Sequence, residues 1–238
     1  MNLEVDDIHA GYTRDIDILQ GVSVQARNGQ LTTIIGANGV GKSTLLKAII
    51  GQLRPHAGRI RYNDTDLTRV ATRELVRFGI AYIAQRHAIF PQMTVLENLE
   101  MGTWSFHHDR QRRQRAVQAC MERAPYLQEF RNRKAGLLSG GQQRLMEIER
   151  ALMTDPELIL IDEPTVGLDP KRADAVYARL RELVSETGKT ILMVDQNILA
   201  GIDAADYVYV LELGKNKLEG TRVEFDTKYR ARMADWLL

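Results

Sequence analysis

The residue types best suited to chemistry gather between Gly36 and Ser43, where the chain reads GANGVGKS. The spacing of Gly36, Gly41, Lys42 and Ser43 is typical of a loop whose backbone N–H groups surround phosphate oxygens. A short apolar run precedes this loop and a segment with helical spacing follows it. The positive end of that helix therefore faces the same anion.

Each polar side chain of this loop has a predicted role at a bound nucleotide. In such a loop Lys42 reaches the β- and γ-phosphates, and the Ser43 hydroxyl ligates Mg²⁺. A glycine-rich turn is the plain alternative, but four matching positions arise by chance in only about one chain in a hundred of this length. The other loop residues that we expect to contact a nucleotide are Asn38, Gly39 and Thr44.

Two adjacent acids follow a second apolar run, in the stretch LILIDEP at 158–164. They stand at the carboxyl end of the predicted strand, where open α/β sheets bind ligands. We expect Asp162 to hold the Mg²⁺ shell and Glu163 to polarise a water molecule for attack on the γ-phosphate. The alternative is that two acids simply mark the point where a strand reaches the surface.

A third motif, LLSGGQQRL, begins at Leu137. Ser139 with Gln142 three residues later has the capping-box pattern, which predicts a helix start with Gly140 and Gly141 in its first turn. The backbone N–H groups of that turn form a second anion site. Taken alone, the motif favours an ordinary capped helix.

The elements that position these motifs alternate between strands and helices. Apolar strands separated by helices predict an α/β fold with a mostly parallel sheet, and alternating residues near the amino terminus predict an antiparallel β portion. Asn28-Gly29 is a hairpin turn signal. The predicted strands are 3–8, 18–27, 31–35, 59–62, 80–84, 158–161, 190–194 and 207–213, and the first helix is 42–51.

One segment lacks strand-like runs and predicts an inserted helical subdomain. We expect a single domain over 1–238, with a nucleotide-binding core at 1–88 and 154–238 and the helical subdomain at about 89–153. Within it, residues 107–115 read HHDRQRRQR, which favours a solvated helix face, with attraction to an anionic membrane as the alternative.

Composition excludes several other functions. Lys and Arg total 32 against 31 Asp and Glu, so the net charge of +1 gives no case for nucleic-acid binding. The single cysteine, Cys120, excludes an intrachain disulfide framework. No apolar run approaches the length of a membrane span, and the acidic, alternating start is unlike a signal peptide, so we expect a cytosolic chain. His107 and His108 have no cysteine or acid cluster beside them to complete a metal site.

Taken together, these motifs resemble the ATP-binding subunit of the ABC transporter family, over nearly the whole chain and in the family's order. Tyr12 stands where the family has its adenine-stacking aromatic residue, and Gln85 stands where it has a glutamine that ligates Mg²⁺ and senses the membrane partner. LSGGQ at 138–142 matches the signature motif, and Asp169 lies in the loop that crosses the dimer. The resemblance implies a P-loop NTPase core.

The resemblance also implies cofactors and partners. Two such subunits, identical or different, are expected to sandwich two ATP molecules with Mg²⁺, each between the Lys42 loop of one chain and the signature of the other. The complex would lie on the cytoplasmic face of the inner membrane, with transmembrane permease subunits and, indirectly, a periplasmic binding protein.

Within the family, IFPQMTVLENLEMG at 89–102 and VDQN at 194–197 resemble the ATPases of branched-chain amino-acid importers. Related urea and short-chain amide importers share these features. The alternatives are a non-transport ABC ATPase, which usually has coiled-coil insertions or a second ATPase domain, and an ATP-gated clamp with little turnover. Phe90 and Met93 are predicted to line a groove for a permease helix, with burial in the core as the alternative.

Two residues depart from the family pattern. Glu149 stands where a small side chain is common, and its sequence context offers no explanation. Gln196 stands where most of the family has a histidine that contacts the γ-phosphate, although glutamine also occurs in the branch named above. At the carboxyl terminus, Phe225, Tyr229, Met233 and Trp236 recur near helical spacing, which favours packing of a terminal helix on the core.

Overall fold

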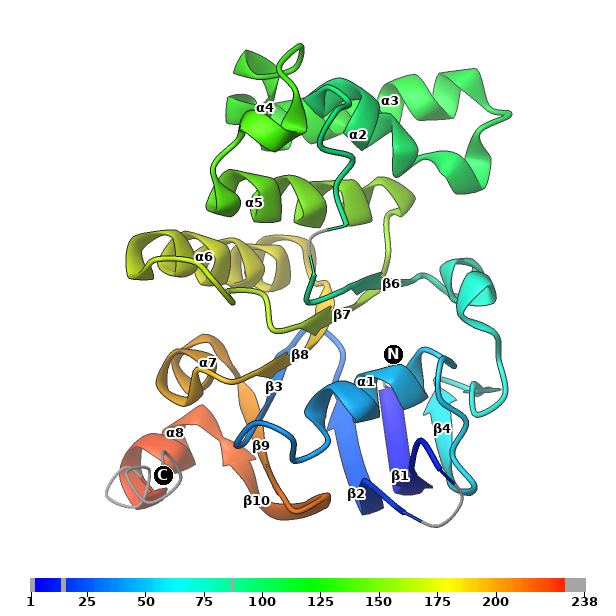
Figure 1. Ribbon diagram of the computed structural model, residues 1–238, viewed down its shortest axis with the longest axis vertical. Helices are drawn as coiled ribbons and strands as arrows, with labels where there is room; N and C mark the ends of the chain where they lie inside the picture. Colours follow the sequence, from blue (N-terminus) through cyan, green and yellow to red (C-terminus); the bar gives the residue numbers. More distant parts are fainter. Residues whose placement is uncertain (1–2, 14–15, 87, 230–238) are drawn as a thin grey trace.

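The computed structural model describes residues 3–13, 16–86 and 88–229. In the described part of the molecule, two sheets lie in the lower half of the view and a group of helices lies at the top (Figure 1). The smaller sheet has four strands in the order β2-β1-β4-β5 and is antiparallel throughout. Its strands are β1 (Leu3–Ala10), β2 (Leu19–Ala26), β4 (Ala57–Tyr62) and β5 (Thr65–Asp66).

The larger sheet has six strands in the order β10-β9-β3-β8-β7-β6. All neighbouring strands pair in parallel except β9 and β10, which form an antiparallel hairpin at one edge. Its strands are β3 (Leu31–Ile35), β6 (Ile80–Ile83), β7 (Leu158–Asp162), β8 (Thr190–Asp195), β9 (Tyr207–Glu212) and β10 (Lys215–Thr221). Both predicted sheets are therefore confirmed.

The turn at Asn28-Gly29 does not close a hairpin, contrary to the sequence prediction. β2 pairs with β1, whereas β3 pairs with β8 and β9 in the other sheet. Burial explains the separation, because β2 alternates between buried and more exposed residues while β3 is buried at all five positions. A strand buried on both sides belongs in the interior of a parallel sheet covered by helices.

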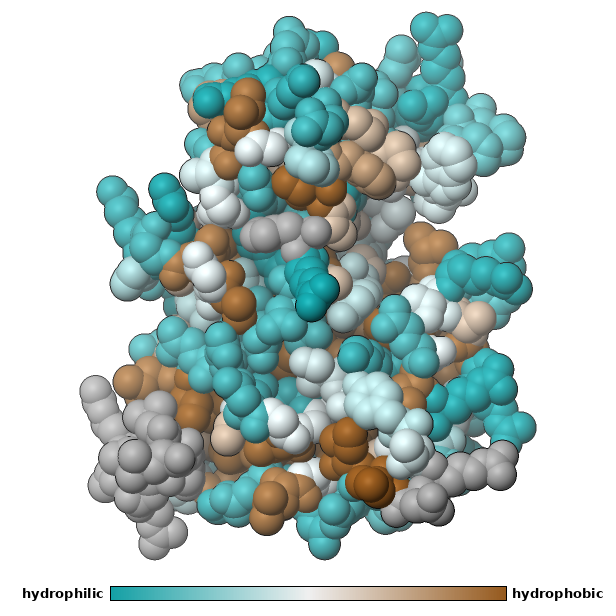
Figure 2. Space-filling view, in the orientation of Figure 1, coloured by the Kyte–Doolittle hydropathy of each residue, from teal (hydrophilic) through white to brown (hydrophobic). Residues whose placement is uncertain are grey.

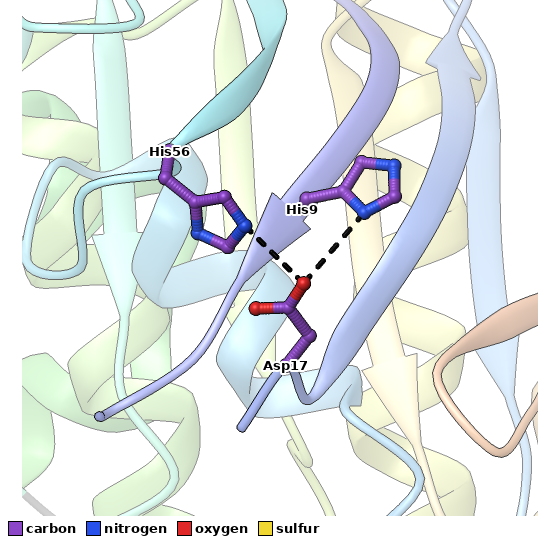
Figure 3. Close-up of side chains that lie close together, drawn as sticks. All are labelled: His9, Asp17 and His56. Carbon is purple, nitrogen blue, oxygen red and sulfur yellow. Dashed lines mark hydrogen bonds and ion pairs between the residues drawn. The ribbon is translucent and has the colours of Figure 1, made fainter. Parts of the chain in front are cut away.

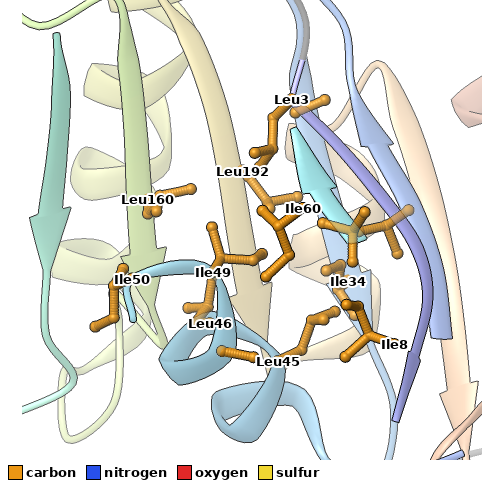
Figure 4. Close-up of a cluster of buried hydrophobic side chains, with 14 of the residues drawn as sticks. Leu3, Ile8, Ile34, Leu45, Leu46, Ile49, Ile50, Ile60, Leu160 and Leu192 are labelled. Carbon is orange, nitrogen blue, oxygen red and sulfur yellow. The ribbon is translucent and has the colours of Figure 1, made fainter. Parts of the chain in front are cut away.

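Helices cover the two faces of the parallel sheet. On one face, α1 (Lys42–Ile49) packs between this sheet and the antiparallel sheet, and Leu45, Leu46 and Ile49 lie in the resulting apolar core (Figure 4). The opposite face contacts α6 (Pro170–Thr187) and α7 (Ile198–Ala204). The described chain ends in α8 (Arg222–Glu224) and a π-helical turn, Phe225–Tyr229.

The described residues between β6 and β7 form helices, 3-10 turns and loops, with one isolated bridge and no strand. A separate apolar core there includes Val95, Leu99, Leu127 and Met146. The helices are α2 (Val95–Met101), α3 (Arg110–Arg123), α4 (Pro125–Glu129) and α5 (Gly140–Ala151). The 3-10 helices of the described chain are Thr72–Phe78, Trp104–Phe106, Ala135–Leu137 and Leu152–Thr154.

Several surface predictions can be compared with this fold. All residues of 107–115 except Arg113 are exposed, as expected for a solvated helix face. Phe225 is buried and its ring lies 5.2 Å from that of Tyr229, in line with the predicted packing, whereas Met233 and Trp236 lie outside the described residues.

Hydrophobic residues form small, separated patches on the face in Figure 2. None of the described helices is long and apolar enough to cross a membrane.

Candidate functional site

The turn between β3 and α1 depends on two glycines, one at a close approach of two backbones and one with a positive φ. Gly36 has a φ of 153°, and a Cβ atom there would lie 2.4 Å from the carbonyl oxygen of Leu211. Gly41 has a φ of 107°, in the range that favours glycine, and directly precedes the first residue of α1. The chain therefore turns sharply, and the first backbone N–H groups of α1 face the loop that precedes them.

Lys42 is buried, and its side chain extends over the same loop. Its Nζ donates to the carbonyl oxygens of Gly36 at 2.8 Å and Ala37 at 3.0 Å. Burial lowers the pKa of Lys42, while the carboxylates of Glu163, Asp195 and Asp162 act in the opposite direction. A cation held among backbone carbonyls and carboxylates is placed to bind an anionic phosphate group.

Ser43 and Asp162 meet between α1 and β7. The Ser43 hydroxyl donates to Asp162 Oδ1 at 2.9 Å, and the Tyr82 hydroxyl reaches Oδ2 of the same carboxylate at 3.5 Å. Burial raises the pKa of Asp162, and the hydrogen bond from Ser43 counteracts that shift. Hydroxyl and carboxylate oxygens in this arrangement form the hard donor set that Mg²⁺ prefers.

Gln85 and Glu163 extend the site along the carboxyl edge of the sheet. The Gln85 amide donates to Glu163 Oε2, so the second residue after β6 contacts the residue directly after β7. Glu163 is buried and adopts a left-handed backbone with a φ of 43°, and its N–H donates to Val194 at 2.9 Å. Such a backbone is uncommon for glutamate, and strain of this kind concentrates at functional sites.

Arg144 of α5 joins the ends of the two strands that carry these residues, and the motif analysis did not single it out. It is buried and donates to the carbonyl oxygens of Ala84 at 2.7 Å, Pro164 at 3.0 Å and Asp162 at 3.1 Å. It also pairs with Glu147 at 3.0 Å. The available signal was an Arg-Glu pair, spaced i,i+3, on a helix that also carries apolar residues.

A second overlooked group lies at the end of β8. Asp195 is buried and accepts from the Tyr177 hydroxyl at 2.7 Å, and Tyr177 in turn contacts the Thr165 hydroxyl at 3.0 Å. Burial raises the pKa of Asp195. The adjacent Gln196 is exposed, and Asn197 rather than Gln196 caps the following helix through its bond from Ala200. Asp195 could have been predicted from the sequence, because it is an acid at the end of an apolar strand.

Tyr12 lies against α1, close to the phosphate loop. Its ring is 58% exposed, and its hydroxyl accepts from Lys47 Nζ at 3.0 Å. This bond is the main reason that the pKa of Tyr12 is lowered. Thr44 is buried on the same helix, whereas Asn38 and Gly39 are exposed at the tip of the loop.

The signature motif lies away from this group of residues. α1 and α5 pack on opposite faces of the parallel sheet, so Ser139, Gly140 and Gly141 do not meet the phosphate loop of their own chain. Ser139 and Gln142 form both bonds of the predicted capping box, at 3.0 and 3.3 Å. A Cβ atom on Gly141 would lie 3.0 Å from the Arg172 side chain, so the signature adjoins the start of α6.

Asp169 stands at that start and caps α6. Its side chain accepts from the Arg172 N–H at 3.1 Å and pairs with the Arg172 guanidinium at 3.2 Å. The structure therefore brings together Lys42, Ser43, Gln85, Asp162 and Glu163 as one group. It brings the signature and the Asp169 loop together as another.

Glu149, which the sequence left unexplained, is a buried ionic junction. Its Oε1 accepts from Arg179 at 2.6 and 2.8 Å, and its Oε2 lies 3.4 Å from Arg123. Charges from α3, α5 and α6 therefore meet at one carboxylate. Two arginines compensate for the burial of this acid, which explains why a small side chain is not needed here.

Comparisons with known proteins agree with this geometry. Residues 19–166 match the family described as ABC transporter. The chain is 36% identical, over 98% of both chains, to the high-affinity branched-chain amino acid transport ATP-binding protein BraG of Pseudomonas aeruginosa. It is 33% identical, over 91% of both chains, to the probable branched-chain amino acid transport ATP-binding protein LivF of Archaeoglobus fulgidus. Relatives named for phosphonate import and lipopolysaccharide export also match.

Solved structures give the same result at the level of the fold. An ATP-binding cassette of an ABC transporter in its ADP conformation superposes with a TM-score of 0.84 at 31% identity and covers 98% of both chains. A dimeric cassette in a post-hydrolysis state, bound to ADP and Pi, has a TM-score of 0.79 at 27% identity and covers 92% of this chain and 98% of its own. From its motifs, its fold and these relatives, this chain belongs to the ABC transporter family, as an ATP-hydrolysing, ATP-binding subunit.

Proposed function

We propose that this chain drives the import of branched-chain amino acids through separate permease subunits. The observation that supports ATP hydrolysis is the meeting of Lys42, Ser43, Asp162 and Glu163 at the carboxyl edge of one sheet. The solute class rests on the names of the relatives at 33% and 36% identity. A urea or short-chain amide importer is the related alternative.

The proposed chemistry depends on positioning and charge. Lys42 binds the β- and γ-phosphate oxygens in place of the loop carbonyls that it now contacts, since its side chain already lies over the loop. Glu163 accepts a hydrogen bond from the attacking water and orients it, while Gln85 holds the carboxylate. Phosphoryl transfer demands little covalent chemistry from a protein, so these contacts account for most of the proposed mechanism.

We propose that Ser43, Asp162 and Gln85 hold Mg²⁺. The Ser43 hydroxyl and the Asp162 carboxylate are already in contact, which fits a shared ion with oxygen ligands. When bound, the ion would neutralise the charge on the phosphate oxygens. Tyr82 limits the freedom of the carboxylate through its hydroxyl, so the ligand is oriented by the protein before any ion arrives.

We propose that the active form is a dimer in which each signature completes the partner's site. The start of α5 lies across the sheet from the phosphate loop, so the N–H groups of Ser139, Gly140 and Gly141 cannot reach a nucleotide on their own chain. A second subunit, identical or different, can supply them. Asp169 lies beside the signature and would share the interface, while Tyr12, Asn38 and Gly39 would contact the nucleotide on the other side.

We propose that a permease helix binds a groove of about 490 Å³ beside β6. Its lining includes Leu75, Val76, Tyr82, Gly102 and Arg150, which come from both the core and the helical segment. This β6 groove can therefore transmit motion between the two. Phe90 is 42% exposed and Met93 is half-buried, and neither lines the β6 groove, so their place on a docking surface remains a separate prediction.

The complex would lie on the cytoplasmic face of the inner membrane, with a periplasmic binding protein on the other side. The test is uptake into proteoliposomes that contain this chain together with the permease subunits and binding protein of a branched-chain amino-acid importer. We expect labelled leucine to enter with ATP, and Lys42→Ala to abolish both hydrolysis and uptake. Uptake of labelled urea or phosphonate instead of leucine would contradict the solute class. Negligible turnover in the complete complex would indicate an ATP-gated clamp.

A cysteine scan tests the groove separately. A cysteine introduced at Val76 should cross-link to a cytoplasmic permease loop, whereas one at Met93 should do so only if the docking surface extends beyond the groove. Cross-links confined to this chain from both positions would contradict the proposed docking site.

A further inference from the structure

Two imidazoles and one carboxylate meet beside the antiparallel sheet, away from the residues assigned to the nucleotide. His9 lies near the end of β1, Asp17 precedes β2, and His56 directly precedes β4 (Figure 3). Asp17 Oδ2 lies 3.2 Å from His56 Nε2 and 3.8 Å from His9 Nδ1. One ligand atom from each residue lies within 4.8 Å of the other two.

The backbone holds the three segments that carry these side chains. The His56 N–H donates to the His9 carbonyl oxygen at 3.0 Å, which ties the start of β4 to β1. The Ile18 N–H donates to the Ala10 carbonyl oxygen at 2.9 Å, which fixes the position of Asp17 relative to β1. His9 therefore lies on a paired strand, and Asp17 and His56 lie in segments that backbone hydrogen bonds tie to that strand.

The second ring nitrogen of His9, Nε2, lies beside a different carboxylate, that of Asp7. His9 Nε2 lies 3.5 Å from Asp7 Oδ1, on the side of the ring away from Asp17. A Cβ atom at Gly21 would lie 2.8 Å from Asp7 Oδ1 and 3.4 Å from His9 Nε2, so the absence of a side chain at Gly21 leaves room for this pair. Imidazoles that bind metals commonly donate their other N–H to a carboxylate, which orients the ring and raises its basicity.

The charges around Asp17 call for a cation between the rings. If His9 donates from Nε2 to Asp7, the lone pair of Nδ1 faces Asp17 Oδ2, and two acceptors then oppose each other. The same oxygen lies 3.2 Å from His56 Nε2 and accepts from it when that nitrogen carries the proton. A second proton on His9, or one metal ion bound by all three groups, would remove the conflict at His9 Nδ1.

We propose that His9, Asp17 and His56 bind one zinc ion, with water as the fourth ligand. Zinc accepts nitrogen and carboxylate ligands at about 2.0–2.2 Å, so tetrahedral ligands lie about 3.4 Å apart. The three ligand atoms lie within 4.8 Å of one another, and rotation of the exposed side chains can bring them closer. The three side chains are 34%, 31% and 55% exposed, which leaves access for the ion and for water.

The ligand types distinguish this site from the proposed magnesium site. Two imidazoles favour zinc or another transition metal, whereas Ser43 and Asp162 offer only oxygen. Bound zinc would join β1, β4 and the segment that leads back from Tyr12, because the three ligands come from these three places. The proposal does not depend on any role of Tyr12 at the nucleotide.

The test measures metal binding by the nucleotide-free chain. Isothermal titration with Zn²⁺ should give one ion per chain at micromolar affinity or tighter, and Co²⁺ should develop the visible absorption of a tetrahedral site. His9→Ala, His56→Ala and Asp17→Asn should each weaken binding by at least about 100-fold. Asp7→Asn should weaken it by about 10–100-fold, because it removes only the carboxylate behind His9.

A matched control uses the other adjacent histidines. His107 and His108 are exposed on the helical segment, and their replacement by alanine should leave zinc affinity unchanged. Circular dichroism without metal should match the parent for every variant. The proposal would be overturned if the parent chain binds no zinc. It would also be overturned if the three ligand variants bind zinc as tightly as the parent.

Discussion

Replacement of Arg144 tests whether the signature helix organises the catalytic edge of the sheet. Arg144→Met keeps the length and apolar stem of the side chain but removes the guanidinium group. The carbonyl oxygens of Ala84, Asp162 and Pro164 then lose a charged donor, and Glu147 loses its cation within a buried environment. Ala84 and Pro164 adjoin the residues that contact each other across the strand ends.

The expected loss follows from the burial of the pair. Removing one partner of a buried ion pair destabilises a protein by about 3–5 kcal/mol, a large fraction of the 5–15 kcal/mol that is typical of a domain. Arg144→Lys retains the charge but cannot serve three carbonyls in different directions. We expect it to cost about 1–3 kcal/mol, since a charged hydrogen bond contributes about that much.

The assay combines urea denaturation with steady-state ATP hydrolysis. Arg144→Met should also reduce hydrolysis by at least about 100-fold at temperatures where it stays folded, because a small displacement of the reacting groups has that effect. Arg115→Met is the control, since Arg115 is exposed on α3 and its loss should change stability by less than about 0.5 kcal/mol. If Arg144→Met unfolds at the same urea concentration as the parent, the reasoning about the buried guanidinium is wrong.

Three further predictions concern single side chains. Glu163→Gln should bind ATP without hydrolysing it and accumulate as a dimer in gel filtration with ATP and Mg²⁺; a strictly monomeric variant, with any partner ATPase supplied, would argue against the sandwich. Gln196→His should raise turnover of the assembled complex by about 5- to 30-fold, from about 1–2 kcal/mol of added charge stabilisation, and the gain should fade as pH rises and the ring loses its proton. An unchanged rate and pH profile would contradict that expectation. Burial raises the pKa of Cys120 to about 12, so its thiol should resist iodoacetamide at pH 8 until urea unfolds the chain, and stability should fall as pH rises from about 9 toward 12; rapid labelling of the folded chain would show that the thiol is accessible.

The phosphate loop and its two flanking elements could be predicted closely from the sequence. β3 is buried at all five positions and α1 begins directly after the glycine-rich loop, so residues close together in the chain indicate this junction. The strand that precedes Glu163 was equally clear, for the same reason. These motifs depend on backbone conformation and on residues that are neighbours in the chain.

The missed features depend on contacts between distant segments. The turn signal at Asn28-Gly29 says nothing about which strand pairs with β2, because that choice is made by burial in two separate sheets. Likewise, the residues near Arg144 in the chain do not indicate which three carbonyl oxygens it contacts, because those oxygens belong to distant segments. Glu149 remained unexplained because Arg179 lies on another helix, 30 positions along the chain.

The way in which α5 is held has a mechanical consequence. Its charged residues Arg144 and Glu149 attach it to the strand ends and to α6, while its apolar residue Met146 lies in the core shared with α2 and α4. A rotation of α2–α4 against the sheet would therefore shear this apolar contact and leave the contacts of α5 with the strand ends and with Arg179 of α6 intact. Arg123, at 3.4 Å from Glu149 and partly exposed, is the tether that such a rotation would stretch. In such a rotation the boundary would run along one side of α5, and the signature would stay with the catalytic sheet although the chain order assigns it to the helical segment.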